Sequence, residues 1–262
     1  DTFFNKYPND LEYLKLENIP KEIEELDIFA ASFFMLTRWE EYVNRNRDNH
    51  DRFPANESFA FKNNFLDRPI VNEYLEILKI LLLQLDCGLT FKQYKFTKNI
   101  SCDVDIPYET YTQSVIKTIK KVAGDIVKRK NIKEAVQTII NYTASKFNNY
   151  SYDPMNTFEW IMEMNEKSGN KVVFYFLVEN TIPEFDGNYN IDEPRIRQLI
   201  RTIDKRGHEI GLHGSYSTYK NKNQIQQQLN ILQRVIKEEG IEQKHIGIRQ
   251  HYLRWSTPET AN

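Results

Sequence analysis

The spacing of apolar residues divides the chain into two regions. In the first, up to about residue 96, apolar positions recur at helical spacing. Residues 27–44 predict a buried, aromatic-rich helix with Asp27 as its N-cap, and the polar stretch 47–69 predicts an ordered loop. A second helix follows and is predicted to end at the stretch 86–88, where Gly88 is a common terminator. Its apolar face comprises Ile70, Val71, Tyr74, Leu75, Leu78, Leu81, Leu82 and Leu85.

From about residue 97 onward, short apolar runs alternate with helical patterns. The predicted strands are residues 96–105, 171–180, 208–213 and 245–249. The predicted helices are residues 112–130, 131–147, 157–169, 193–207 and 222–240. Strands that alternate with helices are typical of βα units in a parallel sheet or barrel. The sequence therefore predicts an α/β domain at residues 97–262, preceded by a helix-rich domain at residues 1–96.

Composition excludes several classes of protein. The 262 residues carry 35 Lys and Arg against 37 Asp and Glu, whereas a general nucleic-acid or anionic-membrane binder normally has a basic excess. The two cysteines, Cys87 and Cys102, match no metal or redox motif, and no apolar run approaches the ~18 residues that span a bilayer. No signal peptide is visible. We expect no nucleic-acid partner, no transmembrane segment and a cytoplasmic location, although the missing initiator Met leaves a processed, periplasmic chain open.

Polar side chains gather where the predicted strands end. Asp103 and Asp105 follow the first strand, His213 ends the third, and Arg249 and His251 follow the fourth. In parallel α/β folds the active site forms at the carboxyl ends of the strands. The convergence of these residues is the main indication of function, because no single one of them would carry it.

Asp103 and Asp105 lie two apart in an extended segment, so their carboxylates point to the same side. Two carboxylates in one pocket repel each other, and a divalent cation between them removes that conflict. Taken alone, the pair is more typical of a solvated turn before Pro107 than of a site.

The segment 206–218 is the most glycine-dense part of the chain and predicts close backbone approach or unusual φ angles near a site. His213, at the strand tip, is suited to a metal such as zinc, whereas His208 is expected to be a structural histidine. Further on, Arg249 is expected to hold a pocket carboxylate by a bidentate contact. His251 is a candidate acid/base group and Trp255 a stacking surface for a sugar, but this segment is as typical of a polar loop with one core Trp.

Three segments, "SCDVDIPY", "LHGSYST" and "IRQHYLRW", occur in the order of the motifs of polysaccharide deacetylases of the carbohydrate esterase type. "RGHEIGLH" is particularly close to the segment before that family's second motif. The N-terminal "DIFAASFFMLTRWEEYVNRNRDNHDRFP" and "FLDRPIVNEY" resemble a domain of unknown function that precedes the catalytic part in an uncharacterised bacterial branch. The resemblance covers most of the chain and implies a partial (β/α) deacetylase-type barrel at residues 97–262.

The resemblance also implies roles for individual residues. Asp103 would be the general base, with Arg249 orienting it, while His251 remains the acid/base candidate indicated by its own position after the fourth strand. Asp105 and His213 would bind a divalent metal, zinc by expectation, with Ser217 at the position of the family's second metal-binding histidine. The substrate would be an acetylated glycan or glycan precursor, with Tyr252 and Trp255 as substrate-binding residues. The resemblance thus implies a carbohydrate deacetylase, a hydrolase that removes N- or O-acetyl groups.

The sequence departs from the family pattern in two ways, and both leave alternative functions open. Serine is a poor zinc ligand, so the site is depleted, recruits His251 or Asp103, or holds the metal weakly. The later family motifs have no counterpart before Asn262, which predicts a truncated barrel. The alternatives are a non-catalytic glycan-binding or assembly protein on a degenerate scaffold, and a glycosyltransferase whose Asp103-Val104-Asp105 holds a nucleotide sugar. The helical pattern of residues 1–96 counts against the glycosyltransferase, which needs a nucleotide-binding βαβ segment upstream.

Overall fold

The structure is a computed structural model that describes residues 27–85, 88–92, 95–111 and 114–261. The chain divides into two compact units, one of residues 1–96 with 254–262 and one of residues 97–253. The change of pattern in the sequence coincides with the division at residue 96. The last residues, from Arg254, group with the first unit and not with the α/β domain to which the sequence pattern assigned them.

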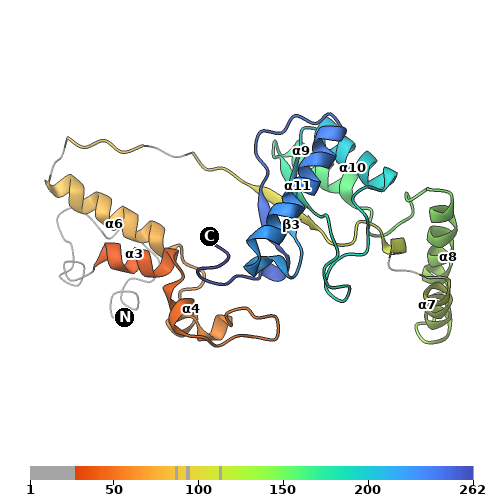
Figure 1. Cartoon of the computed structure of the whole chain (residues 1–262), viewed down its shortest axis with the longest axis horizontal. Helices are drawn as coiled ribbons and strands as arrows, with labels where there is room; N and C mark the ends of the chain where they lie inside the picture. The colour runs from red at the N-terminus through yellow and green to blue at the C-terminus, as the bar shows by residue number, and fades with distance from the viewer. Residues whose placement is uncertain (1–26, 86–87, 93–94, 112–113, 262) are drawn as a thin grey trace. The chain divides into compact units, whose positions relative to one another are not determined.

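The first unit is helical in its described part. Its elements are α3 (Ile28–Leu36), α4 (Trp39–Val43), the 3-10 turn η2 (Ala55–Glu57), α5 (Phe59–Lys62) and α6 (Ile70–Leu85). Figure 1 shows these helices in red to light orange. They share a small apolar core of Ile28, Ala60, Phe65, Ile70, Tyr74 and Ile77.

The helix α3 begins where the sequence predicts a helix but is shorter than predicted. Asp27 caps it, because Asp27 Oδ1 accepts a hydrogen bond from the Ala30 amide at 2.8 Å. The predicted single helix is broken after Leu36, where Arg38 takes a left-handed backbone conformation (φ 55°). The aromatic side chains are also not buried as predicted, since Phe29 is 74% exposed. The predicted end of α6 at residues 86–88 falls largely outside the described residues.

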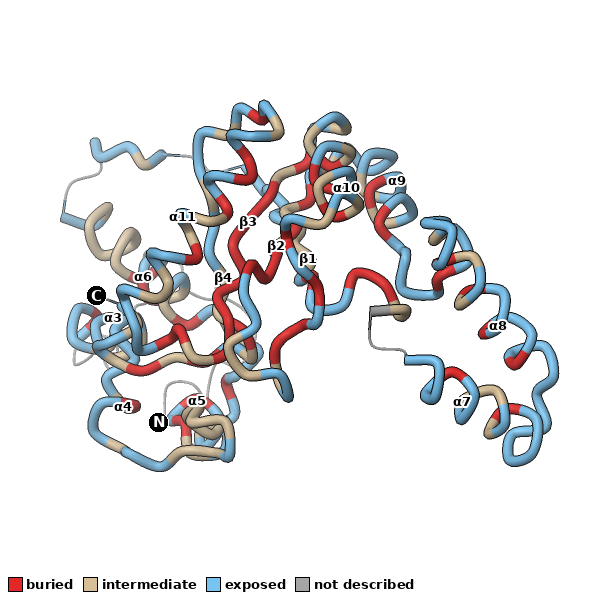
Figure 2. The backbone as a smooth tube through the Cα atoms, turned by 45° about the vertical axis from the view of Figure 1, so that its right-hand side comes forward, coloured by how far each residue is buried: buried red, intermediate tan, exposed pale blue. Residues whose placement is uncertain are grey.

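The second unit is a mixed α/β fold built on a curled, parallel four-stranded sheet (Figure 2). Its strands are β1 (Ile100–Val104), β2 (Val172–Leu177), β3 (Glu209–Gly214) and β4 (Ile248–Gln250), in the order β1-β2-β3-β4. The register pairs Asp103 with Tyr175, Leu177 with His213, and His213 with Arg249. The polar residues at the strand tips are therefore aligned along one edge of the sheet. This confirms the predicted alternation of strands and helices.

Three helices and the strands build the core of this unit. The helices are α9 (Phe158–Lys167), α10 (Pro194–Lys205) and α11 (Lys222–Glu238). Their fully buried residues, such as Met162, Ile200 and Leu232, belong to one core with Phe174 and Leu212 of the strands. Burial of these aliphatic and aromatic side chains supplies about 1.5–3 kcal/mol each. The rigid sheet that results fixes the positions of the strand tips.

A helical hairpin is inserted between β1 and α9. After the 3-10 turn η3 (Glu109–Tyr111) the chain forms α7 (Val115–Val127) and α8 (Ile132–Lys146), which pack against each other. The hairpin stands away from the strands in both views (Figures 1 and 2). None of the described helices has both the length and the apolar character that crossing a bilayer requires.

Candidate metal centre

A cavity of about 510 Å³ lies at the carboxyl ends of the strands. Its lining comes from the ends of β1, β3 and β4 and from the loop that follows β2. It comprises Asp103, Asp105, Ile106, Pro183, Glu184, Phe185, Asp186, Gly187, Asn188, His213, Gln250, His251, Tyr252 and Leu253. Asp103 and Asp105 therefore share one pocket, as their spacing predicts.

Asp105, His213 and His251 form a compact group of metal-ligating side chains in this cavity. One donor atom of each lies within 4.8 Å of the other two. His213 Nε2 lies 3.2 Å from Asp105 Oδ1, and His251 Nδ1 lies 4.0 Å from the same oxygen. The three residues come from the tips of three different strands, so the fold of the sheet alone brings them together.

His213 is held in the orientation that a metal ligand needs. Its Nδ1 lies 2.9 Å from the Arg249 carbonyl oxygen, and because a carbonyl only accepts, Nδ1 carries the hydrogen. Nε2 is then left to face Asp105, with either a proton or a metal between them. Burial lowers the pKa of His213, but the hydrogen bonds to Asp105 and to the Arg249 carbonyl outweigh it and raise the pKa overall. The same hydrogen bond from His213 lowers the pKa of Asp105.

His251 lies against His213 with its ring nearly parallel. The ring centroids are 4.8 Å apart and the planes differ by 8°. His251 is 4% exposed, and its Nδ1 is a buried nitrogen without a hydrogen-bond partner. Burial, together with the charge of His213, lowers the pKa of His251 and favours the neutral imidazole, which is the metal-binding form. An unpartnered buried nitrogen beside a carboxylate is typical of a site that needs a ligand.

Asp186 is a buried carboxylate of the site that the sequence analysis missed. Its Oδ2 accepts hydrogen bonds from the Thr181 amide, the Thr181 hydroxyl and the Ile182 amide at 2.6–3.0 Å. Its Oδ1 accepts from the Tyr216 amide at 2.8 Å and lies 3.6 Å from His251 Nδ1. The residue follows β2, the one strand for which no polar tip was predicted. The unusually long segment between that strand and the next helix was the available indication.

The loop that carries Asp186 lies directly on the end of β1. A Cβ atom on Gly187 would lie 2.0 Å from the Asp105 carbonyl oxygen, so only glycine permits this approach. The Tyr189 hydroxyl donates to the Val104 carbonyl at 2.8 Å and accepts from the Leu177 amide at 2.7 Å. The loop is thereby tied to two strand ends, which positions Asp186 beside His251.

Arg249 contacts Asp103, as predicted, but not in the predicted bidentate way. Nη1 donates to Asp103 Oδ1 at 3.0 Å, whereas Nη2 donates to the Ser101 hydroxyl at 2.7 Å. The guanidinium also lies over the ring of Tyr175, 4.9 Å from its centroid. The ring occupies space that a Cβ on Gly211 would fill, since such a Cβ would lie 2.5 Å from it. This confirms the predicted close approach at one of the glycines of the segment 206–218.

Two of the predicted site residues lie apart from this group. The Ser217 hydroxyl is engaged with Gln224 Oε1 at 3.0 Å, and Ser217 does not line the cavity, so it does not serve as the third metal ligand proposed from the resemblance. Trp255 belongs to the first unit, where Arg38 lies over its ring and its Nε1 donates to Thr257. Tyr252, by contrast, lines the cavity.

Aromatic rings border the cavity on one side. Phe185 and Tyr216 are stacked, with centroids 4.3 Å apart, and Tyr252 meets both rings edge-on at 5.5 and 5.3 Å. Tyr252 also stacks on His251 at 4.8 Å. Its left-handed backbone (φ 58°) turns the chain directly after β4 and places the ring there.

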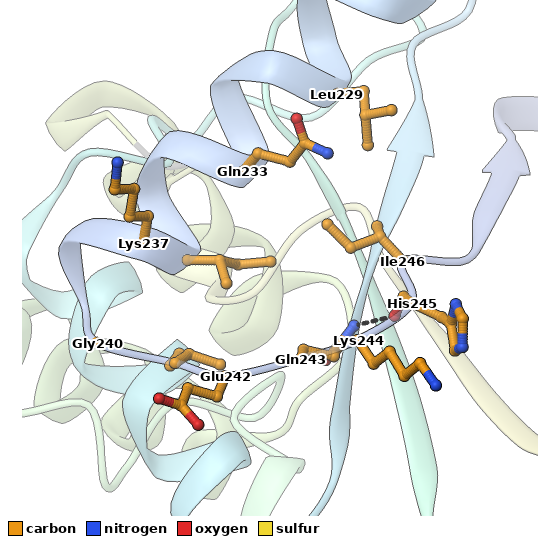
Figure 3. Close-up of a pocket in the computed structure, with 11 residues that line it drawn as sticks. Leu229, Gln233, Lys237, Gly240, Glu242, Gln243, Lys244, His245 and Ile246 are labelled. Carbon is orange, nitrogen blue, oxygen red and sulfur yellow. Dashed lines mark hydrogen bonds between the residues drawn. The ribbon is translucent and has the colours of Figure 1, made fainter.

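A second cavity, of about 620 Å³, lies between α11 and the segment that leads into β4 (Figure 3). Its charged and titratable groups, including Glu242 and His245, are exposed side chains on the protein surface. Gln243 bonds the Ile210 amide, the Ile210 carbonyl and the His245 carbonyl, which gives it a structural role. This cavity lacks the converging buried groups of the strand-tip cavity.

Comparison with known proteins concerns the first part of the chain. Residues 3–86 match the profile of a family of unknown function, DUF7033. No curated protein and no solved structure matches the chain. The matched region ends before β1, so the description of the metal centre rests on its geometry.

The three donors fit a divalent transition metal. Ligands about 2.1 Å from a tetrahedral zinc lie roughly 3.4 Å from one another. The distances from Asp105 Oδ1 to His213 Nε2 and His251 Nδ1, 3.2 and 4.0 Å, bracket that value. Two imidazoles and one carboxylate are a donor set found in catalytic zinc and non-haem iron sites with open positions. The unpartnered Nδ1 of His251 provides an independent reason to expect a ligand here.

Proposed function

We propose that the second unit is a metal-dependent carbohydrate deacetylase that removes acetyl groups from a glycan. The observation that carries the proposal is the group Asp105, His213 and His251, at the carboxyl ends of parallel strands and in one cavity with Asp103. The resemblance of the strand-tip segments to deacetylase motifs supplies the reaction class and the proposed partial deacetylase-type barrel.

Asp105, His213 and His251 would hold the metal. Zinc is the proposed ion, because two histidines and one carboxylate are a donor set of catalytic zinc sites. When bound, such a metal polarises a carbonyl oxygen and lowers the pKa of a coordinated water. The Arg249 carbonyl fixes His213 in the correct tautomer, and Asp186 lies 3.6 Å from His251 Nδ1, the same nitrogen that faces Asp105.

His251 supplies the ligand that Ser217 cannot. The resemblance implies a histidine at position 217, and the serine there left the site incomplete. In the family pattern both metal-binding histidines come from one segment. Here His213 and His251, which are stacked, would supply the two imidazoles from adjacent strands. This compensation favours a working metal centre over a degenerate, glycan-binding scaffold.

Asp103 is the proposed general base. The ion pair with Arg249 and the hydrogen bond from Arg249 to Ser101 orient its carboxylate in the cavity that holds the metal ligands. Tyr252 and Phe185, at the border of the cavity, are suited to stack on the apolar face of a sugar ring. Arg249 acts through Asp103 and is therefore a positioning residue.

Zinc and cobalt binding, measured by calorimetry, tests the metal centre. The full chain should bind at least one of the two ions, and Asp105→Ala and His213→Ala should abolish that binding. His245→Ala is the matched control, because His245 is an exposed histidine outside the site. If the wild-type chain binds neither ion above the level of the two variants, the proposal is wrong.

Acetate release from acetylated chito-oligosaccharides and acetylated xylan tests the reaction. We expect metal-dependent release that Asp103→Asn reduces by about 10²–10⁴-fold, the usual contribution of a general base, while metal binding is retained. Metal binding without acetate release from either substrate would reject hydrolysis and favour the glycan-binding alternative.

A further inference from the structure

The residues that the α7–α8 hairpin buries are mostly polar, whereas most of its large aliphatic residues are exposed. Its buried positions include Thr118 and the fully buried Asp125 on α7, and Thr138, Asn141 and Ser145 on α8. Asp125 pairs with Arg129 on the same helix, and Asn141 donates to Glu109 of the turn η3. Two helices that pack through an apolar seam would bury their isoleucines here instead.

The isoleucines and valines of the hairpin face outward. On α7, Ile116 is 66% exposed, Ile119 63% and Val127 77%; on α8, Ile132 is 69% exposed. Others follow at helical spacing, namely Ile126, Val136, Ile139 and Ile140. Each helix thus presents an apolar stripe to its surroundings, and apolar stripes of this size on two adjacent helices indicate a binding surface.

The same hairpin is strongly basic. Residues 115–147 contain eight Lys and Arg against two Asp and Glu, a net charge of +6 in a chain whose net charge is −2. Lys120, Lys128, Lys130 and Lys133 are all exposed. The balanced composition of the whole chain conceals this local excess. A basic amphipathic helix with outward isoleucines is typical of a segment that lies in the interface of a membrane.

We propose that the α7–α8 hairpin docks the protein on the surface of a bilayer that contains anionic lipid. The lysines would contact the lipid head groups and the isoleucine stripes would enter the boundary with the acyl chains. The charge and the apolar surface together favour a membrane over other partners. A second copy of the hairpin would bring another +6 to the same face and repel the first. A nucleic acid would neutralise the charge but leave the eight exposed aliphatic side chains in water. The docking does not depend on the proposed metal chemistry.

Flotation of the full chain with lipid vesicles tests the inference. Vesicles of equal parts phosphatidylglycerol and phosphatidylcholine should carry the protein, and vesicles of phosphatidylcholine alone should carry much less. Lys120→Gln with Lys128→Gln should weaken binding about 30-fold, since each lysine near an anionic surface contributes about 1 kcal/mol. Ile119→Ser should weaken it by about tenfold through lost apolar burial.

Matched controls use exposed residues elsewhere in the chain. Lys205→Gln with Lys237→Gln removes two exposed lysines of α10 and α11, and Leu75→Ser removes an apolar side chain that is 55% exposed. Both should bind vesicles like the wild type, and circular dichroism should show every variant folded. The inference is wrong if the wild type ignores the anionic vesicles, or if control and hairpin variants lose binding equally. A dimer that Ile119→Ser makes monomeric, without vesicle binding, would also overturn it.

Discussion

Two buried histidines lie at opposite ends of strand β3, and they differ in whether the surrounding side chains leave a buried polar atom without a hydrogen-bond partner. At the amino end, His208 Nδ1 accepts from the Val172 amide at 3.1 Å, so its Nε2 carries the hydrogen and faces Glu166 at 3.1 Å. At the carboxyl end, His213 faces Asp105 and stacks on His251, whose Nδ1 has no hydrogen-bond partner. His208 is satisfied by the protein alone, which confirms its predicted structural role.

The comparison shows that burial does not distinguish a structural histidine from a functional one. His208 and His213 are 4% and 2% exposed. The difference lies in their partners. His208 bonds a backbone amide and a carboxylate, whereas His213 lies against His251, whose buried Nδ1 has no hydrogen-bond partner. A ligand at the second group would give the buried His251 Nδ1 a partner, whereas adding one to the first would displace existing hydrogen bonds.

Removing His251 should therefore abolish metal binding at little cost to the fold. Loss of an outer-shell partner costs about 10–100-fold in metal affinity, so loss of the direct ligand in His251→Ala should cost at least about 100-fold. Cobalt titration followed by its visible absorption would measure this. His208→Ala is the matched control, and equal loss of cobalt binding in both variants would contradict the distinction between the two ends of the strand.

Removing His208 should instead destabilise the fold. His208→Ala leaves the Val172 amide unsatisfied and opens a void beside Phe174, so we expect a loss of about 2–3 kcal/mol in the free energy of unfolding. Urea unfolding of the metal-free protein measures it. A loss below that caused by His251→Ala under the same conditions would show that His208 is not the structural member of the pair.

The strand tips and the side chains that meet there could be predicted from the sequence, but not whether His251 or Asp103 would join Asp105 and His213. Strand and helix periodicity placed Asp105 and His213 at one edge of a sheet, because the carboxyl ends of parallel strands necessarily meet there. Which third residue completes the group depends on how far β4 extends and where the chain turns after it. The left-handed backbone conformation of Tyr252 sets that turn, and nothing in the residues around Tyr252 predicts this conformation.

Longer connections were less predictable still. Asp186 lies in an irregular segment, and its role depends on the close approach that Gly187 allows. Trp255 looked like part of the site because it follows β4 closely, yet the chain leaves the α/β unit at Arg254. Exposed aromatic residues such as Phe29 mimic a buried helix in the pattern, since periodicity reports which face is apolar and not what covers it.

Asp186 is the buried carboxylate beside His251, at the carboxyl end of the sheet. Both carboxylate oxygens of Asp186 accept from backbone N–H groups. Asp186→Asn keeps the size of the side chain but replaces one of these oxygens by an NH₂ group, which cannot accept. We expect a loss of about 1–2 kcal/mol in unfolding free energy from that unsatisfied group. Because Asp186 lies 3.6 Å from His251 Nδ1, metal affinity should also fall, by about tenfold. Calorimetric titration with zinc measures the affinity, and an unchanged zinc affinity would show that Asp186 supports only its own loop.

The smallest expected effect is a pH dependence at the His208 end. The hydrogen bonds from Arg206 lower the pKa of Glu166 from 4.5 to about 2, burial opposes the shift, and His208 adds to it. Because the folded-state pKa is depressed, the stabilisation is fully present above pH 4.5 and is lost as the pH falls through about 2.

Glu166→Gln should thus have a lower urea midpoint than the wild type at neutral pH, and the two midpoints should converge toward pH 2. Glu163→Gln, which removes an exposed carboxylate paired with Lys167 in the same helix, is the control and should show a smaller difference. A gap between Glu166→Gln and the wild type that stays constant down to pH 2 would mean that Glu166 contributes through packing and not through its charge.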